Sequence, residues 1–161
     1  MSIEDDIALL GRVPLFQLLG SDALRVIAIS SDTRPLDKGE ILFREGQFAE
    51  AAYVVVRGRI GLAREDAALA RRPGQHVEAG PGALLGEMAL ITETRRPATA
   101  TALEDSSVMR VPRVIFLRTI DGYPDAAVRV GNALSERLSE TLSELEGVRA
   151  RFEALDPPAQ G

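Results

Sequence analysis

The stretch GEMALITETRRPATATA, residues 86–102, carries the strongest signal in this sequence. Gly86 and Glu87 open a short apolar run that is long enough for one or two helical turns. Arg95 and Arg96 follow, and after them come small and hydroxylated residues. A helix N-terminus favours anions, an arginine fork matches two phosphate oxygens, and small side chains leave room beside a strand. The stretch therefore predicts a site for a phosphate group.

The acid at the start of the stretch adds a second requirement. A carboxylate next to a phosphate is repulsive unless it reaches another group, and a sugar hydroxyl is a suitable donor to it. Phosphate, sugar and a compact cavity together indicate a nucleotide that carries one charge. The alternatives are that Glu87 only stabilises a helix N-terminus and that Arg96 forms a surface ion pair with Glu93 or Asp105. For Arg95 we favour a solvated side chain.

Composition narrows the classes of function. The chain has 161 residues, a net charge of −5, no cysteine and a single histidine, His76. One histidine without cysteine assembles neither a metal site of the usual kind nor a catalytic triad, so we expect no enzyme, metal or cofactor, and a surface or packing role for His76. An acidic chain is a poor non-specific nucleic-acid binder. The sequence contains no apolar stretch that could span a membrane and no basic export signal, which predicts a cytoplasmic protein without membrane contact.

Short runs of strand-forming residues surround the stretch and are separated by glycine turns. The runs most typical of strands are EILFREG, AYVVVRG, RIGLAR, QHVEAGPG, TATAL and SVMRVP. AYVVVRG is almost wholly apolar, which predicts a strand buried on both faces. Their spacing predicts a mainly β fold with flanking helices, in which a jelly-roll barrel (a double-stranded β-helix) forms the middle of the chain.

Both ends of the chain have helical patterns. Ser2 and Asp5 fit a capping box, and Ser21-Asp22 is a candidate cap for the run ALRVIAIS, with Pro14 separating the two helices. After Tyr123, apolar residues recur at spacings of four and seven, which predicts one long amphipathic helix. Such a stripe serves to pack on the barrel, on a second copy of the chain, or on both.

Taken together, these residues resemble the cyclic nucleotide-binding domain family, of the type found in catabolite activator proteins and in protein kinase A regulatory subunits. The family pattern G-E-(apolar)-A-L, followed by R-x-A-T, is matched at Gly86, Glu87, Ala89, Leu90, Arg96, Ala98 and Thr99. The upstream segments VPLFQLL and KGEILFREGQFAEAAYVVVRGRIGLAR and the downstream segment DSSVMRVPRVIFLRTI also resemble the family. The resemblance covers residues 13–145.

The resemblance implies a role for each matching residue. Arg96 would pair with a cyclic phosphate, and Glu87 would accept from the ribose 2′-hydroxyl. Gly86 and the N–H groups of Met88 and Ala89 would help to hold the sugar and phosphate. Three further residues would line the phosphate and base side, namely Pro97, Ala98 and Thr99. The C-terminal helix would close over the base as a lid, with Leu134 and Arg137 as candidate contacts.

Three departures from the family pattern bear on the ligand. Leu85 replaces the usual aromatic residue before Gly86, which alters packing. Pro97 stands where many relatives have a Thr or Ser whose hydroxyl helps to hold guanine, so its presence favours cAMP over cGMP. Proline also lacks a backbone N–H donor, which weakens ligand binding. Arg95 stands where relatives carry proline or other residues.

The resulting hypothesis is a bacterial, non-enzymatic sensor of a cyclic mononucleotide whose C-terminal helix moves on binding and acts on an unidentified effector protein. The alternative is a degenerate domain that serves as a protein–protein interaction module without nucleotide. We expect one domain over residues 1–155 that forms a homodimer through its last helix. Its parts would be N-terminal helices (1–31), the barrel (33–112) with a phosphate-binding cassette (86–99), hinge and lid helices (113–155), and a disordered tail (156–161).

Overall fold

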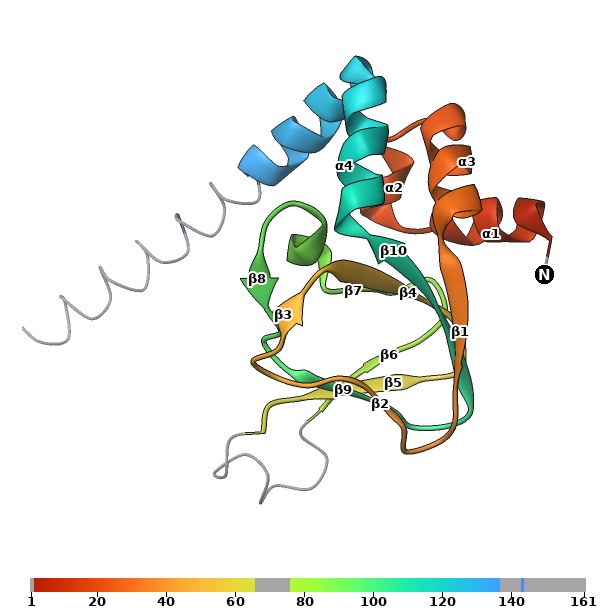
Figure 1. Cartoon of the computed structure of the whole chain (residues 1–161), viewed down its shortest axis with the longest axis vertical. Coiled ribbons are helices and arrows are strands. Elements are labelled where there is room, and N and C mark those ends of the chain that lie inside the picture. Colours follow the sequence, from red (N-terminus) through yellow and green to blue (C-terminus); the bar gives the residue numbers. More distant parts are fainter. Residues whose placement is uncertain (1, 66–75, 137–142, 144–161) are drawn as a thin grey trace, which may run out of the picture.

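The computed structural model describes residues 2–65, 76–136 and 143. Helices flank a middle region of antiparallel strands, and Figure 1 shows α1 to α4 gathered on one side of the sheets. In chain order the elements are α1 (Ile3–Leu10), α2 (Pro14–Gln17), α3 (Ser21–Ser30), β1 (Asp32–Leu36), β2 (Ile41–Phe43), β3 (Phe48–Ala49), β4 (Ala51–Arg57), β5 (Ile60–Ala63), β6 (Val77–Ala79), β7 (Leu84–Leu85), the 3₁₀ helix η1 (Glu87–Leu90), β8 (Thr94–Arg95), β9 (Thr99–Ala102), β10 (Ser106–Pro112) and α4 (Arg113–Gly122).

The strands form two four-stranded sheets and one short ladder. The first sheet has the order β1-β10-β4-β7, the second has the order β2-β9-β5-β6, and β3 pairs with β8. Neighbours are antiparallel throughout, and sequence neighbours often lie in different sheets, which is the pattern of a jelly roll. The predicted mainly β fold with flanking helices is confirmed.

Strand β4 faces two separate apolar clusters. Ala52 and Val54 point toward the helices, whereas Tyr53 and Val55 point into the barrel. Successive side chains of a strand alternate between faces, so a strand with a cluster on each side must be apolar throughout. The strand buried on both faces is therefore confirmed, and it joins the two halves of the core.

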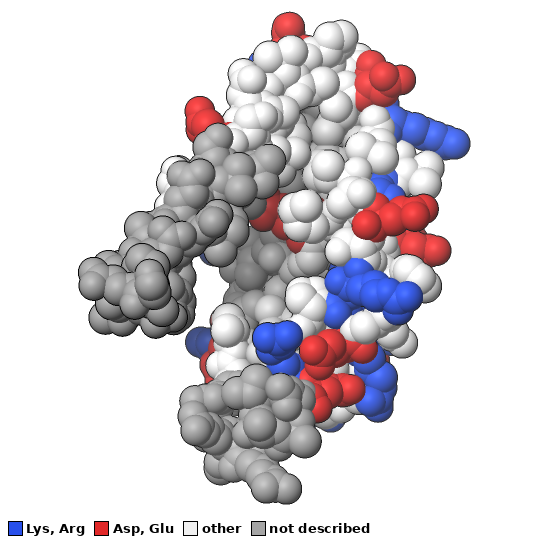
Figure 2. Space-filling view, turned by 90° about the vertical axis from the view of Figure 1, so that its left-hand side faces the viewer, with Lys and Arg blue, Asp and Glu red and all other residues white. Residues whose placement is uncertain are grey.

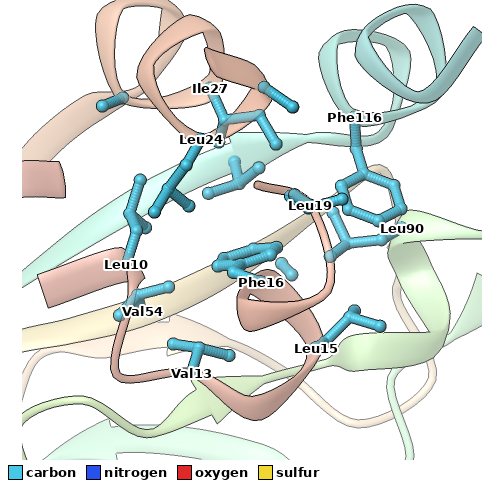
Figure 3. Packing of buried hydrophobic residues seen from close by; sticks show 14 of the residues in the cluster. Leu10, Val13, Leu15, Phe16, Leu19, Leu24, Ile27, Val54, Leu90 and Phe116 are labelled. Atoms are coloured by element: carbon cyan, nitrogen blue, oxygen red, sulfur yellow. The ribbon is translucent and has the colours of Figure 1, made fainter. Parts of the chain in front are cut away.

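The larger cluster, here the helical cluster, contains buried residues of α1 to α4, Leu90 of η1, and Ala126 and Val130 further along the chain, packed on the outer face of β4 and β10. Figure 3 shows Phe16 at its centre, with Phe116 of α4 on one side and Leu10 on the other. The Phe16 and Phe116 rings lie 6.0 Å apart in a tilted arrangement. Because α4 contributes Phe116 to the same cluster as α2 and α3, it is anchored to the N-terminal helices.

The N-terminal helices agree in part with the sequence expectations. The capping box of α1 is confirmed, since Ser2 Oγ accepts from the Asp5 N–H and the Asp5 carboxylate accepts from the Ser2 N–H, both at 3.2 Å. The cap predicted at Ser21-Asp22 is wrong by one residue, because Gly20 is the N-cap of α3 at a φ of 83°. Pro14 begins the extra short helix α2, for which its fixed φ is suited.

The C-terminal helical region is divided at Tyr123. Helix α4 ends there, and a second helix extends over residues 124–136. Ala126, Val130 and Leu134 of this second helix pack on the helical cluster. Arg137 and most of the heptad stripe lie outside the described residues. Over the described ranges, the longest apolar helices fall short of the length and hydropathy that a membrane span requires.

Charged side chains are mixed on the surface. On the face presented in Figure 2, acidic and basic residues interleave. Exposed pairs such as Arg34–Glu40 at 3.4 Å and Arg59–Glu78 at 3.2 Å are of this kind, and each contributes at most about 1 kcal/mol. On the described part of this face, side chains of the two signs alternate without forming a continuous patch of either sign.

Candidate functional site

The site begins at the turn between β7 and η1. Gly86 is the N-cap of η1 and has a φ of 76°, in the left-handed region that favours glycine. A Cβ atom at this position would collide with Nη1 of Arg96. The backbone conformation and the close approach of the Arg96 side chain therefore both favour glycine at residue 86.

Arg96 follows β8 directly, and its backbone is held on both sides. Its N–H donates to the Gln47 carbonyl and its carbonyl accepts from the Gly46 N–H, both at 2.8 Å. These bonds fix the Cα atom beside the β3–β8 ladder, so the side chain enters the protein from there. The residue is only 5% exposed, which makes a surface ion pair with Glu93 or Asp105 the wrong interpretation.

The guanidinium of Arg96 is only partly satisfied. Nη2 donates to the Ala51 carbonyl at 2.6 Å, while Nη1 is buried without a hydrogen-bond partner among the described residues. The group lies over the Phe43 ring at 4.2 Å and is 5.6 Å from the centre of the Tyr53 ring. Burial lowers the pKa of Arg96, with the nearby Arg110 adding to this, although an arginine stays charged at neutral pH. A buried cation with an unpaired donor is chemically able to bind an anion.

The two residues after Arg96 line a wide hollow. Pro97 and Ala98 border an open pocket of about 790 Å³ together with Leu62 and Val77, and with Glu45, Ala63, Arg64 and His76. Its lining combines apolar side chains with a few polar ones, which suits a small organic ligand. Thr99 is turned inward, and its Oγ1 accepts from the Glu45 N–H at 2.9 Å, so it holds the β2–β3 turn in place.

Glu87 occupies a different hollow. It lines a pocket of about 220 Å³ between α2 and the helix 124–136, together with Leu15, Leu18 and Leu134, and with Pro14 and Ala133. The structure thus brings Glu87 and the lid candidate Leu134 together. Neither of them lines the hollow of Pro97 and Ala98.

The remaining cassette residues have distinct environments. Met88 is exposed, whereas Ala89 is fully buried and its N–H donates to the Gly86 carbonyl at 3.0 Å within η1. Arg95 is exposed; it donates to the Gly46 carbonyl at 3.0 Å and stacks on Phe48 at 4.2 Å. His76 contacts Glu78 at 3.2 Å, and the described residues contain no group of three or more potential metal ligands.

Sequence reasoning missed three residues that shape this site. Phe43 and Tyr53 support the guanidinium of Arg96, and Arg113 binds the carbonyl of Ala89. The two aromatic residues occur in predicted strands, where nothing separates a core ring from one that carries a cation. Within the described part of the chain, the hydrogen bonds of the Arg113 side chain go to backbone carbonyls, which a sequence pattern does not reveal.

Comparison with known proteins agrees with this geometry. The family model of the cyclic nucleotide-binding domain matches residues 33–123. The chain therefore belongs to the cyclic nucleotide-binding domain family, and the resemblance found in the sequence is confirmed.

Individual relatives are similar over most of this chain. The cyclic AMP receptor protein of Thermus thermophilus is 31% identical over 133 residues, which is 83% of this chain and 61% of that protein. A cyclic nucleotide-binding-like protein from Brucella abortus is 41% identical with a TM-score of 0.63, over 73% of this chain and 98% of its own. The N-terminal domain of a transcriptional regulator from Streptomyces coelicolor is 27% identical with a TM-score of 0.74, over 85% and 94%. The chain spans 7% of lysophospholipase NTE1 of Chaetomium globosum, to which it is 27% identical over 111 residues.

Proposed function

We propose that this chain binds a cyclic mononucleotide, cAMP in preference to cGMP, and acts as a non-enzymatic regulatory domain. The observation that carries the proposal is the buried Arg96 guanidinium, whose Nη1 lies against Gly86 without a partner. A phosphodiester carries a single negative charge, so it would satisfy this donor and offset the cost of burying the cation. The Thermus thermophilus relative, which is named as a cyclic AMP receptor protein, supports the same ligand class.

The rest of the cassette would complete the site. Pro97 and Ala98 border the hollow that would take the base, and Glu87 would accept from the ribose 2′-hydroxyl. Because Glu87 and Leu134 line the same pocket, a ligand that binds Glu87 would change the packing of the helix 124–136. In our proposal this helix and the residues after it, Arg137 included, shift on binding, and they act on an effector protein or a second copy of the chain in the cytoplasm.

A thermal-shift panel tests the ligand class. A ligand present at 100 times its dissociation constant stabilises the folded state by about 2.7 kcal/mol. For a domain of this size that corresponds to an increase in Tm of roughly 5–10 °C. We expect this increase with cAMP, a smaller one with cGMP, and none with cyclic dinucleotides or ATP. No shift with any cyclic mononucleotide would overturn the proposal and leave the interaction module.

The role of Glu87 is tested with a ligand that lacks the 2′-hydroxyl. A hydrogen bond to a charged group contributes about 1 kcal/mol more than a neutral one, and glutamine keeps an acceptor oxygen, so Glu87→Gln is expected to weaken cAMP binding about 5-fold in calorimetry. With 2′-deoxy-cAMP the variant and the natural chain should bind equally. Glu93→Gln removes one negative charge from an exposed position of the same loop and serves as the control. An equal loss for both ligands would contradict the contact with the sugar.

A further inference from the structure

Arg113 joins the cassette to the helix that follows the barrel through a single nitrogen atom. Its Nη1 lies 2.8 Å from the Ala49 carbonyl, 3.3 Å from the Ala89 carbonyl and 3.1 Å from the Thr92 carbonyl. These acceptors belong to β3, to η1 and to the turn after η1. One nitrogen with two hydrogens cannot serve three acceptors fully, so the three carbonyls share it and are drawn around it.

Arg113 is also the first residue of α4. Its backbone N–H donates to the Glu50 carbonyl at 2.9 Å. A movement of η1 relative to β3 therefore changes the surroundings of the residue from which α4 begins. The helix cannot keep both its backbone bond and the side-chain bonds unless it follows.

The backbone of residues 49–51 also holds Arg96, the arginine proposed to bind the phosphate. The Ala49 and Glu50 carbonyls accept from Arg113, and the next carbonyl, that of Ala51, accepts from Nη2 of Arg96. Three consecutive peptide groups thus connect the guanidinium proposed for the phosphate with the start of α4. Pro112, immediately before Arg113, pairs with Ala51 in the β10–β4 ladder, so the segment has little freedom to relax alone.

We propose that Arg113 is a positioning residue that couples the cassette to α4. This inference rests on the proposed function, because it assigns to Arg113 the transmission of ligand binding from η1 and Arg96 to the C-terminal helices. Coupling is a free energy shared by two sites, so its test must measure the response at α4 to an event at the cassette.

The experiment is amide hydrogen exchange on the full chain, with and without cAMP at a concentration shown by calorimetry to saturate each variant. In the natural chain, cAMP is expected to slow exchange both in residues 86–92 and in α4. In α4 of the natural chain the slowing should be about tenfold, a value typical of allosteric coupling. In Arg113→Met the slowing should persist in residues 86–92, but in α4 it should fall to less than about twofold. Arg118→Met is the matched control, since Arg118 is an exposed arginine of the same helix. Equal responses of α4 in the two variants would overturn the inference.

Arg113→Lys guards against misfolding of the methionine variant. The three hydrogen bonds from Arg113 to the carbonyls of Ala49, Ala89 and Thr92, here called the bridge, need hydrogens on a single nitrogen. Lysine presents such hydrogens, so it should restore at least half of the response in α4. A folded lysine variant with no response in α4 would overturn the single-nitrogen bridge.

Ligand-free samples separate this inference from the ligand assignment. In Arg113→Met without ligand, exchange should rise in residues 89–92 and at the start of α4 together, and Arg118→Met should change neither. If cAMP slows exchange nowhere in the natural chain, the proposed function fails. The ligand-free measurement still tests whether Arg113 connects η1 to α4. Unchanged exchange in both segments would overturn the bridge itself.

Discussion

Replacement of Arg96 by methionine is expected to weaken cAMP binding by about 100-fold or more, because truncating one partner of a buried charge pair costs roughly 2–5 kcal/mol. Arg96→Lys should lose most of this affinity as well. An ammonium keeps the charge but lacks the planar fork that would bind the Ala51 carbonyl and a phosphate oxygen at once. Isothermal titration calorimetry of the three proteins checks the order of affinities.

Arg96→Met should leave the ligand-free protein as stable as before, or make it more stable. Arg96 is a buried cation with an unsatisfied Nη1, and burial of a charge without full compensation is unfavourable. Methionine keeps contact with the Phe43 and Tyr53 rings and removes the charge, which offsets the loss of the hydrogen bond to the Ala51 carbonyl. Loss of affinity at an unchanged or higher Tm would mark Arg96 as a residue kept for binding at the expense of stability.

Arg95→Met is the control for both measurements. Arg95 is adjacent in sequence, has the same charge and is exposed on the surface with Phe48. It should change cAMP affinity by less than about threefold, which is the scale of screened surface charges. Equal losses in the two variants, or unimpaired binding in Arg96→Met, would contradict a direct contact between Arg96 and the phosphate.

The strands that the sequence revealed are those with a buried face. β4 and β10 contain long apolar runs because each contributes to one or both clusters. β1 was missed, since the run DTRPL is exposed except for Leu36, and its Pro35 is tolerated because the strand lies at a sheet edge. β3, β7 and β8 have two residues each, which is too short for any periodicity to be visible.

The site was predictable only in its residue types. Composition and order around Gly86 and Arg96 indicated an anion and a sugar, and the family resemblance assigned the roles. The depth of burial of Arg96, its aromatic support and its contact with Gly86 follow from how β2, β4 and β7 meet in space. No local sequence pattern predicts how these strands approach one another, and the contacts of Arg113 with backbone carbonyls cannot be predicted from the sequence either.

Gly86→Ala is expected to reduce both stability and ligand affinity. A left-handed backbone costs a residue with a Cβ atom about 1–2 kcal/mol, which lowers the free energy of unfolding by at least that amount. The new methyl group would also displace the Arg96 guanidinium from its place beside residue 86. We therefore expect cAMP affinity to fall about 30-fold or more, since a displaced charge pair loses a large part of its energy.

Gly39→Ala separates backbone strain from displacement of Arg96. Gly39 has a φ of 89°, but a Cβ there meets no atom within 4 Å, so this variant carries the strain alone. It should lose about 1–2 kcal/mol in denaturant unfolding and keep its cAMP affinity. If Gly39→Ala weakened binding as much as Gly86→Ala, the loss would reflect general destabilisation of the barrel.

Combining Gly86→Ala with Arg96→Met relieves the contact between the new methyl group and Arg96, because the methionine side chain is shorter and carries no Nη1. The excess destabilisation of Gly86→Ala over Gly39→Ala should then disappear, leaving only the strain of the left-handed backbone. Residues in direct contact give non-additive effects of about 0.5–3 kcal/mol in such a cycle, whereas independent residues give additive ones. Additive losses in unfolding free energy would mean that residue 86 does not position the Arg96 guanidinium, and glycine would then be needed there for the turn alone.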